Sequence, residues 1–65
     1  MREHEQKVKD LVLKEYTQFK GIYNEHDMRT LLVGYVHGLT ELGLYRFDAE
    51  EVTRYIAHLL EREAK

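Results

Sequence analysis

Residues 31–45 have the sequence LLVGYVHGLTELGLY, which combines the apolar spacing of a helix with three glycines. A glycine inside a helix costs up to about 1 kcal/mol relative to alanine. Apolar residues recur every three or four positions, and this spacing predicts a helix over residues 25–42. Gly43 follows its last residue, where chains commonly turn through a left-handed conformation, and Leu44 is placed to fold back onto the last helical turn. Gly34 and Gly38 lie inside the helix and need another explanation.

Two further segments show the same apolar periodicity. They predict helices over residues 4–21, with Gly21 near the end, and over residues 49–63. Asn24 and Asp48 are placed to cap the second and third helices, because their side-chain oxygens can accept from backbone amides of the first turn. The expected core stripe of the first helix consists of Val8, Val12, Tyr16, Phe19 and Tyr23. Glu15 then lies at the rim of this stripe; if it is buried instead, it needs a partner such as Arg46 or a tyrosine hydroxyl.

The predicted fold class is all-α. No segment shows the strict alternation of a strand, and the connections are short, so consecutive helices should be antiparallel neighbours. The sequence predicts one domain, residues 1–65, as a compact three-helix bundle. A chain of this length buries only about 60% of the surface that its unfolded form exposes. We therefore expect it to gain stability by associating as a homodimer.

Gly34 and Gly38 extend the apolar arc of the second helix from about 140° to about 200° of its circumference. A helix with so wide a contact surface touches more than one neighbour. One interpretation is that the glycines let another helix of the same chain come close. The other is that they lie where this helix meets its own copy or a partner protein. The interface residues predicted by the second interpretation are Leu31, Gly34, Tyr35, Gly38, Leu42 and Tyr45.

The sequence predicts neither an enzyme nor a metal site. It contains no serine, no cysteine and no glycine-rich phosphate loop, so the usual nucleophiles and phosphate cradles are missing. The sequence has four histidines; His37 and Glu41 lie one helical turn apart and could together offer two ligands, but a metal site needs three or four. We expect no cofactor and no small-molecule substrate.

The charge balance argues against nucleic acid as the partner. Ten Lys and Arg stand against twelve Asp and Glu, whereas phosphate binding normally needs a basic excess. The alternative is a helix-turn-helix, with its turn at residues 42–47 and the third helix reading the nucleic acid. No apolar run is long enough to span a membrane, and the chain does not begin with a signal peptide, so we expect a cytoplasmic protein.

The functional expectation is a small, non-catalytic protein–protein interaction module. Short chains without catalytic residues are often regulators or inhibitors, including those of bacteria and their phages. Such a module acts by occluding or stabilising the partner protein that it binds. A purely structural or assembly role is a further alternative.

Overall fold

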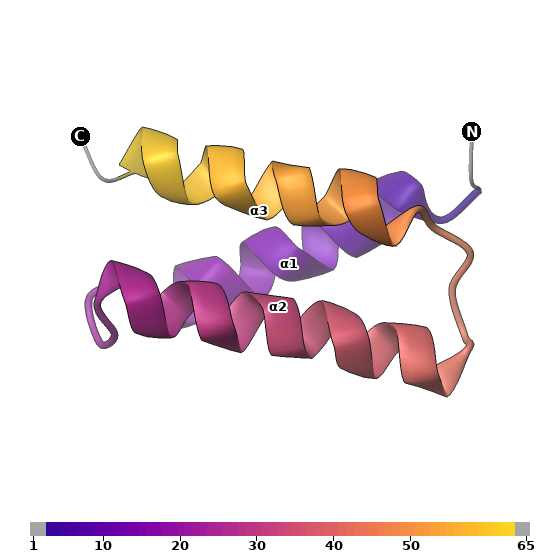
Figure 1. The fold of residues 1–65 in the computed structure, drawn as a ribbon, viewed down its shortest axis with the longest axis horizontal. Coiled ribbons are helices and arrows are strands. Elements are labelled where there is room, and N and C mark those ends of the chain that lie inside the picture. Colours follow the sequence, from indigo (N-terminus) through magenta and orange to yellow (C-terminus); the bar gives the residue numbers. More distant parts are fainter. Residues whose placement is uncertain (1–2, 64–65) are drawn as a thin grey trace.

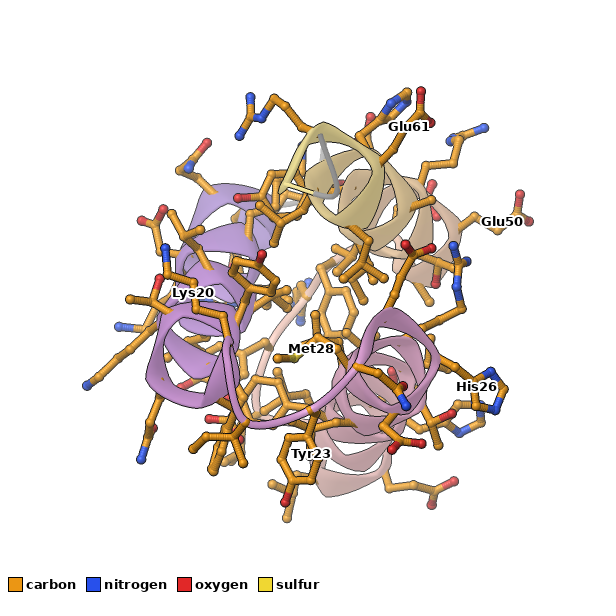
Figure 2. All side chains as sticks on the ribbon, turned by 90° about the vertical axis from the view of Figure 1, so that its left-hand side faces the viewer. Lys20, Tyr23, His26, Met28, Glu50 and Glu61 are labelled. Carbon is orange, nitrogen blue, oxygen red and sulfur yellow. The ribbon has the colours of Figure 1, made fainter. Side chains whose placement is uncertain are left out.

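The computed structural model describes residues 3–63 and contains three helices. These are α1 (Glu5–Phe19), α2 (Glu25–Leu42) and α3 (Ala49–Glu63). Consecutive helices run antiparallel, and seen end-on the three form a triangle (Figures 1 and 2). The radius of gyration, 11.3 Å, is close to the value of about 11 Å for a compact chain of this length. The all-α, compact three-helix prediction is confirmed.

The core lies on the common axis of the three helices, and the buried residues that form it within residues 3–63 are all hydrophobic types. Met28 points into this space in Figure 2, whereas His26, Glu50 and Glu61 point outward. Each helix contributes residues at the three-and-four spacing of one face, as the sequence predicts. The buried residues are Val8, Val12, Tyr16, Met28, Leu32, Val36, Leu39, Val52, Ile56, Leu59 and Leu60.

The first helix ends earlier than the prediction of residue 21. The amide of Lys20 still donates to Tyr16 O, but Lys20 itself has an extended backbone conformation. Gly21 then adopts a φ of 88°, a left-handed value that favours glycine. Tyr23 follows this turn and is 45% exposed, so its predicted place in the core stripe is wrong. Glu15 is half-buried at the rim, and no buried carboxylate is present among the described residues.

The other helix ends follow the predicted capping chemistry. Asn24 Oδ1 accepts from the amide of Asp27 at 2.8 Å, and Asp48 Oδ1 accepts from the amide of Glu50 at 3.0 Å. Gly43 has a φ of 68°, and its amide donates to the carbonyls of the last turn of α2. Leu44 does not fold back onto this turn; it is 67% exposed.

The start of α1 is fastened to the connection between α2 and α3. The amide of His4 donates to Arg46 O at 3.0 Å, and the amide of Arg46 donates to His4 Nδ1 at 2.9 Å. The His4 ring also meets the Tyr45 ring edge-on, with centroids 5.6 Å apart. These contacts fix the position of Tyr45 beside the end of α2.

Candidate interaction surface

Five of the six predicted interface residues form one stripe along α2. Their spacing of three or four residues places them on neighbouring turns over a length of about 16 Å. Gly34, Gly38 and Leu42 are exposed, and Leu31 and Tyr35 are half-buried against the core. The sixth residue, Tyr45, is half-buried in the connection after α2. We call this set the glycine edge: Leu31, Gly34, Tyr35, Gly38, Leu42 and Tyr45.

Gly34 and Gly38 face open space. A Cβ atom built on either glycine meets no atom of the described chain within 4 Å, apart from its immediate helical surroundings. No other helix therefore comes close at these positions, and the interpretation that the glycines serve packing within the chain is wrong. Neither residue has a positive φ, so the local backbone does not require glycine either.

Tyr35 connects the glycine edge to α1. Partial burial raises the pKa of Tyr35, and the negative charge of nearby Glu15 on α1 raises it further. Tyr45 adds a smaller effect in the same direction. The two groups whose charge acts on Tyr35 thus come from α1 and from the connection before α3. The sequence suggested a tyrosine hydroxyl as one partner for Glu15, and the structure places Tyr35 near it.

Further apolar side chains are exposed at the two ends of α2. Ile22, in the turn before α2, is 69% exposed, and Leu42 and Leu44 at the other end are 65% and 67% exposed. Figure 2 shows Tyr23 lying between the ends of α1 and α2, on the side away from α3. The periodicity of the first segment places Ile22 on its apolar face, and Leu44 was expected to fold back onto the last turn of the second helix, but both side chains are exposed. Each of them directly follows a glycine that ends a helix, and this position could have indicated that the side chain is exposed.

His37 and Glu41, the ligand pair considered from the sequence, do not belong to a larger cluster of metal ligands within residues 3–63. No group of three potential metal ligands occurs among the described residues, and His37 and Glu41 are both exposed. An open hollow of about 330 Å³ lies at the α1–α2 turn, with Tyr16, Lys20, Tyr23 and Met28 in its lining. Asn24 and Glu25 also line this hollow.

No protein-family model, curated protein or solved structure matches this chain. Within residues 3–63, no helix has the length and apolar character needed to cross a membrane. The surface chemistry of the chain is therefore the basis for a functional assignment.

Proposed function

We propose that this chain is a small, non-catalytic protein–protein interaction module that binds another polypeptide through the glycine edge. The observation that carries the proposal is the open space beside Gly34 and Gly38. Two glycines inside a helix lower its stability by about 1–2 kcal/mol together. Nothing within the described chain uses the space that they leave, and an approaching helix backbone would use it.

The side chains around the glycines support the same function. Leu42 is largely exposed, and Leu31, Tyr35 and Tyr45 each keep part of their surface in water. Tyrosine combines an apolar ring with a polar tip and is enriched at protein interfaces. Binding would bury these apolar surfaces together with the bare backbone at Gly34 and Gly38. The module would then act as a regulator or inhibitor that occludes or stabilises its target.

The charge around the glycine edge favours a protein over a nucleic acid. Asp27 and Glu41 are exposed on the same side of α2, and Glu15 lies beside Tyr35. Carboxylates repel phosphates, so this side is unsuited to a nucleic-acid backbone. Figure 1 also shows α3 running back alongside α2, whereas a helix-turn-helix joins helices that cross steeply. The proposal includes a cytoplasmic setting, with which the lack of cysteine is consistent.

The test uses a variant that blocks the glycine edge without disturbing the fold. Gly34→Gln/Gly38→Gln places two long polar side chains in open space, and glutamine favours helix over glycine. His58→Gln, at an exposed position on α3, is the matched control. Wild-type, blocked and control chains are immobilised, and proteins retained from a bacterial lysate are identified, purified and titrated individually.

The proposal expects a purified protein, or a second copy of the chain, to bind the wild type and His58→Gln equally. The same protein should bind Gly34→Gln/Gly38→Gln at least about tenfold more weakly. Circular dichroism checks that the blocked variant keeps its helices. Equal binding to all three chains, or no binding to any of them, would show that the glycine edge is not an interface.

A further inference from the structure

We infer that the polypeptide that fits the glycine edge is a second copy of this chain, with the two α2 helices packed antiparallel. The two-fold axis passes between Gly34 and Gly38. This inference rests on the proposed function and specifies the partner at the same surface. It follows from the order of residues along the edge and from the charges at its two ends.

The residues of the glycine edge are arranged almost symmetrically about the point midway between residues 36 and 37. In an antiparallel pair centred there, Leu31 lies opposite Leu42 of the second copy, and Gly34 lies opposite residue 39, one residue from Gly38 of the second copy. Exposed leucine thus meets half-buried leucine at both ends of the contact. The bare backbones cross at the centre, where close approach is possible because no Cβ atom intervenes.

Charge complementarity selects the antiparallel arrangement over the parallel one. A parallel two-fold pair would place Asp27 near Asp27 and Glu41 near Glu41 of the second copy, and facing like charges are unfavourable. In the antiparallel register, Asp27 lies toward the connection that carries Arg46 of the second copy. Glu41 lies opposite residue 32 of the second copy, within one helical turn of Arg29 of that copy. Asp27, Glu41 and Arg46 are all exposed in the single chain.

A dimer interface of standard size needs more surface than the stripe on α2 offers. A dimer of standard size buries about 800 Å² on each partner. That is about one sixth of the 4877 Å² exposed by this chain. The stripe on α2 alone would cover only part of this area. Leu44, which continues the apolar surface beyond Leu42, and Tyr45 would have to contribute.

Engineered cysteines test the register, because the natural chain has none. A disulfide needs Cα atoms within about 7 Å of each other. Leu31→Cys and Leu42→Cys chains are prepared separately and oxidised either alone or as an equimolar mixture. The inference expects cross-linked dimers in the mixture and little cross-linking of either variant alone. Efficient cross-linking of each variant alone would indicate a parallel pair and would overturn the inference.

Sedimentation equilibrium over a wide concentration range tests the association itself. We expect wild type and His58→Gln to form dimers, and Gly34→Gln/Gly38→Gln to raise the dimer dissociation constant at least about tenfold. A monomeric wild type whose glycine edge still binds a foreign protein would overturn this inference and leave the proposed function intact. A monomeric wild type without any edge-dependent partner would overturn both.

Discussion

Replacing Gly34 or Gly38 with alanine should stabilise the isolated chain. Both positions are helical, exposed and open, so the added methyl group meets no described atom within 4 Å. Alanine removes backbone freedom from the unfolded chain and has the highest helix propensity. We expect each substitution to raise the free energy of unfolding by about 0.5–1 kcal/mol. For a domain of this size, 1 kcal/mol corresponds to a rise in Tm of about 4–8 °C.

Gly21 and Gly43 provide a matched control for this prediction. A Cβ atom on either residue would also meet open space, but their φ values are 88° and 68°. Alanine is strained in this left-handed region by about 1–2 kcal/mol. The same chemical change should therefore stabilise the chain at Gly34 and Gly38 and destabilise it at Gly21 and Gly43. Space is equal at all four sites, so the difference in sign isolates the backbone conformation.

The assay is urea denaturation followed by circular dichroism, repeated at several protein concentrations. At high dilution, where the chain is monomeric, the Gly34 and Gly38 variants should have higher midpoints than the wild type. If two copies pack through the glycine edge, the advantage should shrink or reverse as concentration rises, because the added methyl groups keep the backbones apart. A loss of stability at high dilution would refute the reasoning, since it would mean that the monomer itself needs these glycines.

Three other substitutions test contacts made by the side chains of Tyr35, Glu51 and His4. Because the pKa of Tyr35 is raised on folding, the associated stability is present below about pH 10 and is lost as the pH rises through the folded-state pKa. In the Tyr35→Phe variant, the urea midpoint should therefore decrease less than in the wild type as the pH is raised above about 10. An equal decrease in both chains would show that Tyr35 does not contribute to this pH dependence. A side-chain hydrogen bond that protonated Glu51 donates to Glu5, together with the charge of Glu5, raises the pKa of Glu51 above its ordinary value of 4.5, so this contribution to stability is lost as the pH rises through the folded-state pKa. Glu51→Gln should be more stable than wild type at neutral pH, with the advantage gone in acid; equal midpoints at neutral pH would argue against the pair. His4→Phe keeps a ring beside the connection but removes the acceptor of the Arg46 amide, and should cost about 1 kcal/mol in the same assay, whereas no change would show that this hydrogen bond adds nothing.

The helices were predictable because their signals are local. Apolar spacing defined the buried faces, and the caps at Asn24, Gly43 and Asp48 depend on residues within one turn. The early end of α1 was harder to predict, because a lysine such as Lys20 is common within helices and does not indicate an extended backbone. Leu44 was misplaced for a related reason: a leucine after a capping glycine often contacts the helix, but the connection is instead fastened to His4.

Contacts between distant segments could not be derived from periodicity. The pairing of His4 with the connection before α3 joins residues 42 positions apart, and no spacing rule relates them. The proximity of Glu15 to Tyr35 depends on how α1 is rotated against α2, which the sequence left open. Likewise, the sequence placed Gly34 and Gly38 on a widened face of α2 but did not determine whether the chain itself would cover that face.

The stability of so short a chain makes the open glycines informative. At about 0.05–0.15 kcal/mol per residue, a domain of 65 residues has about 3–10 kcal/mol of stability. Two avoidable helix glycines reduce it by about 1–2 kcal/mol, a considerable fraction. Gly21 and Gly43 are explained by their left-handed backbone, and an explanation of that kind is missing for Gly34 and Gly38. A contact between this backbone and that of a partner would offset the lost stability. A partner that binds only the folded chain shifts the folding equilibrium toward the folded state. The alanine variants separate the free energy of folding from the free energy of binding. At the same two positions, alanine should stabilise the folded monomer and weaken its association.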